Sequence, residues 1–334
     1  MGVLYISMKC AGGESALRTE PFAMLQEVLA MNHSLTVTYY HHSGFSVATE
    51  DTLLIFDYWL GEKDMLPEEK RITLEMLNRY KRVYVFISHE HRDHCDPVVF
   101  TWRGQAPVRY IISDDMPGDV TGERIRSGET MALTDRISVT AYDSTDLGVS
   151  FLVTLDGVRI FHAGDLNFWH WRDEVSIKEI EEAEADFTKA MKPLEGLRMD
   201  VAFFPVDPRM GQMYDAGANT FIMAAKPRLM LPMHFWGRKS IAAEFARRSS
   251  NRDTQVIALT RYGEELYIHI DEDGVLSAKP ALQPETMAAP MPRARALQLE
   301  TPFVQEQPVE ASAYEEDDPF SDTDLPIQFE EGQL

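Results

Sequence analysis

The sequence contains only two cysteines, Cys10 and Cys95, among its 334 residues. Two cysteines are too few for the disulfide framework of a small secreted domain. No uninterrupted apolar run reaches the eighteen or more residues that a membrane span needs. The N-terminus also lacks the basic region and apolar core of a signal peptide. Together these absences predict a cytoplasmic protein with no membrane association.

Positive charge is scarce as well. The chain has 54 acidic and 32 basic side chains, a net charge of −22. No basic stripe is present that could hold a phosphate backbone, so nucleic acid is not an expected partner. Residues 281–334 contain twelve acidic and two basic residues, many prolines and alanines, and no hydrophobic periodicity. They predict a disordered acidic tail, mainly solvating, whose apolar stretches near Phe303 and in 320–329 offer a site for a protein partner.

The segment before residue 35 carries no chemistry. Residues 1–34 are interpreted as an N-terminal extension, and Met31 offers an alternative start of translation just before the first clear strand pattern. The folded domain is predicted over residues 35–280, and an apolar content of 44% is ample for its core.

Short runs of β-branched and aromatic residues between turn residues predict strands in this domain, and amphipathic segments predict helices. The predicted strands are 35–40, 45–49, 52–56, 83–87, 108–112, 137–142, 149–155, 158–162, 201–204, 229–232, 256–259 and 265–270. The predicted helices are 67–79, 174–197, 217–225 and 240–249.

A cluster of histidines follows the apolar strand 83–87. His89, His91, Asp93 and His94 lie within six residues. Their spacing does not place them on one helical face, but a turning loop can bring them together. Neutral imidazole and carboxylate suit zinc, manganese or iron, and gathering so many polar groups without a cation is costly. The cluster therefore predicts a metal site at a strand end.

Other polar residues also stand at strand ends. Asp57 follows one apolar run, Asp165 another in His-Ala-Gly-Asp, and His234 a third in Pro-Met-His. Asp143 and Asp146 precede the strand 149–155. Residues at strand ends gather at one edge of a sheet, where sites are commonly built.

The ordered set Asp57, His89-x-His91-x-Asp93-His94, Gly164-Asp165 and His234 resembles the metallo-β-lactamase superfamily over about residues 35–270. The Tyr-His-His-Ser-Gly segment and the His-Ala-Gly-Asp motif are most similar to the L-ascorbate 6-phosphate lactonase-like branch of metal-dependent hydrolases. The resemblance implies an α+β fold, a four-layer αββα sandwich with its metals at one edge of both sheets. Similarity to that branch also implies a homo-oligomer.

The resemblance further implies how two divalent ions, zinc or manganese, are held. The ligands carried over are His89 and His91 for the first ion, Asp93, His94 and His234 for the second, and Asp165 between both. Asp57 is implied as a support that hydrogen-bonds the histidine loop.

One departure from the family pattern concerns the first ion. The family usually supplies a third histidine before the strand that leads to Gly-Asp, but no histidine occurs between His94 and His162. Asp146 or Asp143 could replace it, His162 could turn into the site, or the first site could be weak or empty. We favour an aspartate, and Asp146 over Asp143.

The chemistry expected of a two-metal site is hydrolysis. Bound metal lowers the pKa of water from about 16 to about 7, which provides hydroxide to attack an ester, lactone or phosphoester bond of a small-molecule substrate. Asp93 is the expected catalytic residue, which orients the nucleophile and passes a proton to the leaving group. His42, Trp169 and Trp236 are expected beside the ligands or the substrate.

Two alternatives remain open. The chain could be a catalytically impaired member of the fold that binds a metabolite or a partner. It could also be a nuclease of the superfamily, which its acidic charge disfavours.

Overall fold

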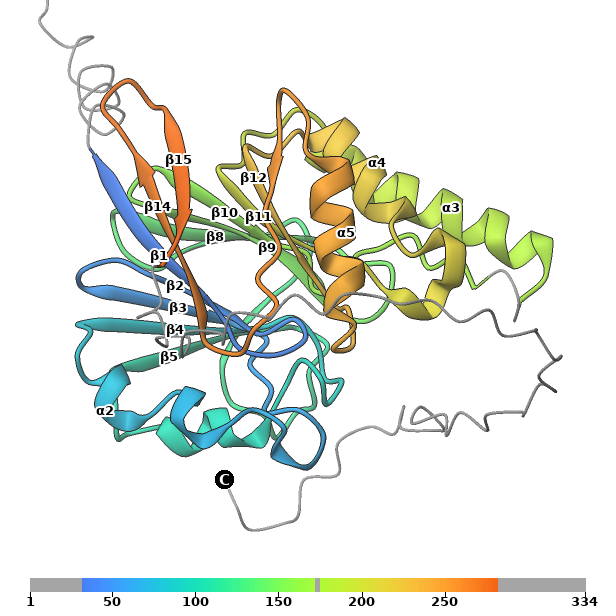
Figure 1. Cartoon of the computed structure of the whole chain (residues 1–334). Helices are drawn as coiled ribbons and strands as arrows, with labels where there is room; N and C mark the ends of the chain where they lie inside the picture. The colour runs from blue at the N-terminus through green and yellow to red at the C-terminus, as the bar shows by residue number, and fades with distance from the viewer. Residues whose placement is uncertain (1–31, 172–174, 282–334) are drawn as a thin grey trace, which may run out of the picture.

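The structure, a computed structural model, describes residues 32–171 and 175–281. Two β-sheets pack face to face, and helices cover the outer face of each (Figure 1). The predicted α+β class and four-layer αββα sandwich are confirmed by this arrangement. No helix within the described ranges is long and apolar enough to cross a membrane.

The first sheet has the order β15-β14-β1-β2-β3-β4-β5-β6. Its strands are β1 (His33–Tyr39), β2 (Phe45–Ala48), β3 (Thr52–Phe56), β4 (Arg82–Ile87), β5 (Val108–Ser113), β6 (Glu123–Ile125), β14 (Glu264–Ile270) and β15 (Leu276–Pro280). Strands β3 to β6 run parallel, and the others pair antiparallel. Every residue of β3 is buried, as expected of a central parallel strand that is covered on both faces.

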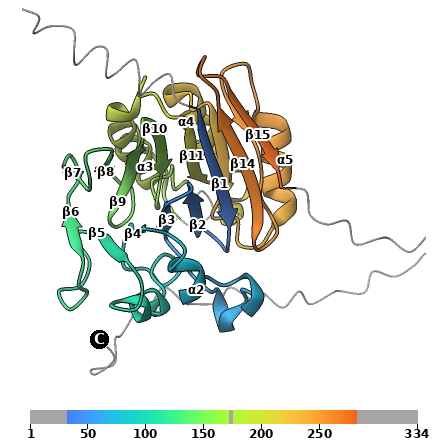
Figure 2. The ribbon, with the colours of Figure 1, turned by 90° about the vertical axis from the view of Figure 1, so that its left-hand side faces the viewer.

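The second sheet has the order β13-β12-β11-β10-β9-β8-β7. Its strands are β7 (Thr130–Ala132), β8 (Ile137–Asp143), β9 (Val149–Leu155), β10 (Val158–His162), β11 (Val201–Pro205), β12 (Leu229–Met233) and β13 (Gln255–Val256). Strands β10 to β13 are parallel. In Figure 2 the strands of the first sheet follow one another from β6 on the left to β14 and β15 on the right, next to β1.

The two helical layers differ in how much helix they contain. Helices α3 (Ile177–Met191), α4 (Ala216–Ala225) and α5 (Lys239–Ser249) cover the second sheet, and α2 (Leu74–Leu77) lies by the first (Figure 1). The 3₁₀ helices are Glu62–Asp64, Glu68–Lys70, Pro97–Trp102, Lys192–Leu194 and Pro208–Met213. Helix α3 starts at Ser176, which forms a capping box with Glu179.

An apolar core fills the space between the sheets. Phe45 and Phe56 of the first sheet stand against Phe203 of the second, with ring centroids 4.5 and 6.2 Å from it, and Phe86 meets Phe151 at 5.4 Å. All five rings are fully buried. Burying an aromatic side chain contributes on the order of 2 kcal/mol, so this layer fixes the sheets and the strand ends that emerge from them.

The structure corrects several predicted elements. The predicted helix 67–79 is interrupted and only partly helical. Arg71 is extended between Glu68–Lys70 and α2, and the Ile72 amide donates to the Tyr58 hydroxyl at 3.0 Å. The helix predicted over 174–197 is shorter, and the strand 256–259 is replaced by the two-residue β13. Strands β6, β7 and β15 were not predicted, since they are short and largely solvent-facing.

The described elements run from His33 to Pro280. The predicted extension falls almost wholly on residues 1–31, and the predicted acidic tail on residues 282–334. Both lie outside the described residues, and these two assignments stay predictions.

Candidate metal centre

The candidate site lies where strands of both sheets end. The loop that follows β4 carries the histidine cluster, and the residues just past β3, β10 and β12 are Asp57, Asp165 and His234. The turn between β1 and β2 adds His42. Parallel strands present their carboxyl ends at one sheet edge, where α/β proteins commonly place a site.

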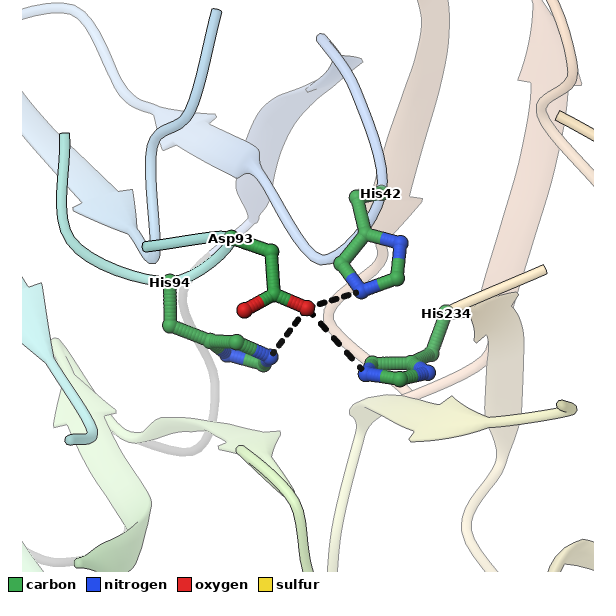
Figure 3. Close-up of side chains that lie close together, drawn as sticks. All are labelled: His42, Asp93, His94 and His234. Atoms are coloured by element: carbon green, nitrogen blue, oxygen red, sulfur yellow. Dashed lines mark ion pairs between the residues drawn. The ribbon is translucent and has the colours of Figure 1, made fainter. Parts of the chain in front are cut away.

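Four side chains converge in a first group, shown in Figure 3: His42, Asp93, His94 and His234. Asp93 Oδ2 lies 3.1 Å from His42 Nε2, 3.9 Å from His94 Nε2 and 3.9 Å from His234 Nε2. One ligand atom from each residue lies within 4.8 Å of the others. Three imidazoles and one carboxylate at this spacing can surround a single cation.

A second group contains His89, His91 and Asp165. His89 Nε2 lies 3.0 Å from His91 Nδ1 and 3.5 Å from Asp165 Oδ2. These two groups match the division of ligands implied by the resemblance, with His42 as the addition. Sequence reasoning placed His42 only beside the ligands.

Asp165 belongs to both groups in space. Its Oδ1 lies 3.0 Å from His94 Nε2 and 3.4 Å from His234 Nε2, whereas its Oδ2 faces His89. The two oxygens of one carboxylate are thus divided between the two sets of imidazoles. This is the placement needed for a carboxylate that bridges two ions.

Asp57 holds the histidine loop in place. Its Oδ1 accepts a hydrogen bond from the Ser88 amide at 2.8 Å, and its Oδ2 accepts from the Ser88 hydroxyl at 2.6 Å and from His94 Nδ1 at 2.8 Å. Since the Ser88 hydroxyl donates to Asp57, it accepts from His89 Nδ1 at 2.9 Å. Both rings therefore donate from Nδ1 on the outer side and direct Nε2 at the site.

Asp207 performs the same task for His234. It follows β11, is fully buried, and its Oδ2 accepts from His234 Nδ1 at 2.9 Å. Sequence reasoning assigned Asp207 no role. The sequence pattern that identified Asp57 and Asp165 also applies to Asp207, because it is a polar residue just past an apolar strand.

The donors facing the centre fit a metal. The Nε2 atoms of His42, His94 and His234 and the Oδ1 of Asp165 are buried and have no hydrogen-bond partner among the described residues. A buried polar atom without a partner typically costs about 1–3 kcal/mol. A cation coordinated by these four atoms would satisfy all of them at once.

The protonation of these groups also suits metal binding. Burial lowers the pKa of His42 to about 3 and that of His89 to about 4, which keeps both rings in the neutral, ligating form. Burial alone would raise the pKa of Asp165, but the surrounding histidines hold it well below its usual range. Burial would lower the pKa of His94, yet Asp165 and Asp93 raise it, so a cation would displace a proton there.

The sequence pattern of the family described as "Beta-lactamase superfamily domain" matches residues 36–234, more than half of the chain. The chain belongs to the β-lactamase superfamily. A UPF0173 metal-dependent hydrolase of Archaeoglobus fulgidus is 27% identical over 225 residues, which cover 60% of this chain and 83% of that protein. The metallo hydrolase Igni18 from Ignicoccus hospitalis has 19% sequence identity and a TM-score of 0.52, and the match covers 70% of this chain and 98% of that one.

These findings confirm the superfamily and its fold. The predicted class of metal-dependent hydrolase agrees with the names of both relatives. Neither comparison distinguishes the lactonase-like branch, which stays a prediction.

The residue expected to complete the first metal site, beside His89 and His91, is one of three candidates. Asp146 Oδ2 lies 3.9 Å from His91 Nδ1, its side chain is 41% exposed, and burial together with Asp165 raises its pKa. Asp143 is exposed at the end of β8 and belongs to neither group. His162 does not turn into the site, because Nε2 donates to the Ser43 carbonyl at 2.9 Å and Nδ1 accepts from the Gly164 amide at 3.2 Å. Of Asp146, Asp143 and His162, only Asp146 forms a contact with His91.

Aromatic side chains form one wall of the centre. The Trp236 ring lies 4.4 Å from the His42 ring and 5.7 Å from the His234 ring, measured between centroids. Trp169 lies 5.6 Å from His234, and its Nε1 donates to the Asp165 carbonyl at 3.0 Å. Both indoles therefore stand beside the ligands, as expected from the sequence. His41 instead packs against Trp59 and Tyr262.

Backbone strain is concentrated at this edge. His42, Asp57, His234 and Trp236 all have positive φ, between 41° and 60°. Non-glycine residues rarely adopt this region, and each costs on the order of 1 kcal/mol or more. Gly164, also at positive φ, lies against the metal loop, where a Cβ would approach the Ser88 Cβ to 2.8 Å. The strain indicates that the fold is shaped to bring these side chains together.

Proposed function

We propose that the chain is a metal-dependent hydrolase that cleaves an ester, lactone or phosphoester bond in a small molecule, using two divalent ions, zinc or manganese. The observation that carries this proposal is the pair of histidine groups that face opposite oxygens of Asp165. The names of both relatives support it. Lactones are the first substrates to test, because the Tyr-His-His-Ser-Gly and His-Ala-Gly-Asp segments resemble the lactonase-like branch.

Two ions would be held unequally. His42, Asp93, His94 and His234 would hold one ion, and His89 and His91 the other, with Asp165 between them. When bound, such ions activate water as a nucleophile and polarise the bond under attack. The His42 group offers four donors besides Asp165. The His89 group offers two imidazoles and Asp146, whose Oδ2 lies 3.9 Å from His91 Nδ1. We therefore propose that the ion held by the His42 group binds more tightly.

The protein's own residues orient the reaction. Asp57 and Asp207 orient His94 and His234 by accepting hydrogen bonds from Nδ1, so that Nε2 of each ring faces the site. Asp93 is 19% exposed, whereas His42, His94 and His234 are almost fully buried. Its carboxylate is the part of the first group that a substrate can reach, and it is placed to orient the attacking water and to hold its proton.

Metal analysis combined with activity measurements tests the proposal. Protein purified without added metal, and protein reloaded with zinc or manganese, would be examined by elemental analysis. Each form would be assayed with 4-nitrophenyl acetate, a γ-lactone, bis(4-nitrophenyl) phosphate and single-stranded RNA. We expect one to two ions per chain and metal-dependent hydrolysis of an ester, lactone or phosphodiester.

Fewer than one ion per chain and no hydrolysis would contradict the proposal and favour a binding protein. Cleavage of RNA alone would favour the nuclease.

A further inference from the structure

Arg209 stands at the edge of the metal centre, in the 3₁₀ helix that follows β11. Asp207 holds it firmly. Asp207 Oδ1 accepts from the Arg209 amide at 2.8 Å, and Oδ2 accepts from Arg209 Nε at 3.1 Å and Nη2 at 2.8 Å. Asp207 is fully buried, whereas the Arg209 side chain is 31% exposed. A buried carboxylate thus anchors the guanidinium of a side chain that is partly exposed.

Arg209 also packs on the aromatic wall of the centre. Its Cζ lies 4.6 Å from the centroid of the Trp236 ring and 5.3 Å from that of the Trp171 ring, within cation–π distance of both. Trp236 in turn contacts His42. Arg209 therefore contacts two residues that themselves contact candidate metal ligands. Trp236 packs against His42, and Asp207 accepts from His234 Nδ1.

One edge of the guanidinium stays available. Arginine has five N–H donors, and Asp207 occupies the edge formed by Nε and Nη2. The opposite edge includes Nη1, which has no hydrogen-bond partner among the described residues. Such an edge matches the two oxygens of a carboxylate or phosphate group.

The charges of the loaded centre do not oppose an anion. Burial would lower the pKa of Arg209, but Asp207, Asp93 and Asp165 raise it, so the cation feels the carboxylates of the centre. The carboxylates at the centre are Asp57, Asp93, Asp146, Asp165 and Asp207. Two divalent ions would add four positive charges, and Arg209 adds a fifth. With Arg209 included, the positive charges would equal the five carboxylates, so Arg209 offsets the remaining negative charge that an anionic substrate group would otherwise meet.

We propose that Arg209 is a specificity-determining residue that binds an oxyanion, a carboxylate or a phosphate, carried by the substrate beside the bond that is cleaved. This proposal rests on the proposed hydrolase function, which it deepens by naming a substrate class. A purely structural role is the competing explanation, since Arg209 also neutralises Asp207 and Asp207 orients His234.

Binding of simple anions tests the proposal without turnover. Metal-loaded wild type, Arg209→Met, Arg209→Lys and the control Arg248→Met would be titrated with glutarate and with inorganic phosphate, followed by tryptophan fluorescence and calorimetry. Arg248 is an arginine of α5 that pairs with Glu244. We expect Arg209→Met to raise the Kd of one anion roughly ten- to a hundredfold, Arg209→Lys to raise it less, and Arg248→Met to leave it unchanged. The anion most affected distinguishes carboxylate from phosphate.

Hydrolysis and metal content provide the second readout. We expect Arg209→Met to raise KM for mono(4-nitrophenyl) glutarate roughly tenfold more than KM for 4-nitrophenyl acetate, with the metal retained. Equal losses on both esters together with loss of metal would overturn the proposal in favour of the structural role. Unaltered anion affinity in Arg209→Met, or no anion binding by wild type, would overturn it directly. Absence of all ester, lactone and phosphodiester hydrolysis contradicts the hydrolase function instead, and the titration then still decides the role of Arg209.

Discussion

His42 Nε2 lies 3.1 Å from Asp93 Oδ2, although the two residues come from separate loops, the turn after β1 and the loop after β4. This contact places a third imidazole beside His94 and His234 (Figure 3). The centre thus lacks a histidine on the His89 side, where the family pattern expects one, and has an extra histidine on the other side. The two candidate groups of metal ligands are therefore unequal.

Replacing His42 tests this asymmetry. We expect His42→Ala to weaken binding of the tighter ion by at least tenfold, because removal of a ligand costs more than removal of a supporting residue. The neighbouring His41→Ala is the matched control, since His41 packs against Trp59 and Tyr262 and belongs to neither group. Metal content after dialysis against a weak chelator measures the effect. Equal metal retention by both variants would show that His42 is not a ligand.

Asp207 should matter for metal affinity through His234. Asp207→Asn weakens the acceptor that orients His234 Nδ1, and we expect a 10- to 100-fold loss of metal affinity. Asp200 is a suitable control, because it is equally buried but pairs with Arg198 and Arg228. Asp200→Asn should lower thermal stability and leave metal affinity intact. If both variants lose stability and neither loses metal affinity, Asp207 is purely structural.

The sequence predicted the parts of the centre that rest on local patterns. His89, His91, Asp93 and His94 stand together in the chain, and Asp165 and His234 each end an apolar strand. Such residues meet at one edge because parallel strands end there. The sandwich itself was implied by the resemblance.

Contacts between distant loops were not predictable in the same way. The position of His42 depends on a turn with φ of 52°, and no pattern identifies a non-glycine residue in that conformation. Asp207 and Arg209 act on residues that are far away in the chain. The interrupted helix 67–79 shows the same limit, since the Tyr58 hydroxyl, a tertiary contact, holds Ile72 outside any helix.

The His89 side of the centre has fewer candidate ligands, and substitutions of Asp146 and Asp143 test which residue completes it. We expect Asp146→Ala to lower the occupancy of the ion on the His89 side several-fold, because the Asp146 carboxylate lies 3.9 Å from His91 Nδ1. Asp143→Ala, in the same connection between β8 and β9, should change nothing. Elemental analysis of both variants beside wild type measures the ions per chain. Two tightly held ions in Asp146→Ala would exclude Asp146 as a ligand.

Metal-free protein should lose stability as the pH falls from about 6.5 to about 4. Burial lowers the pKa of His42 to about 3 and of His89 to about 4, whereas an unfolded histidine titrates near 6.5. In this window the unfolded chain binds more protons, so acid favours unfolding by about 1.4 kcal/mol per pH unit for each such group. The raised pKa of His94 acts in the opposite direction, but only above pH 6.5, where its stabilisation declines with rising pH.

Denaturant unfolding of chelated protein at pH 7, 6 and 5 measures this loss. His42→Asn carries no titratable ring and should show a shallower decline than wild type over the same range. Parallel declines in wild type and His42→Asn would mean that His42 is not the buried neutral group that the structure places at the centre. Metal-loaded protein should be more stable than the chelated form at pH 7, and this gain should shrink towards pH 5, because protons compete with the cation for the same nitrogens.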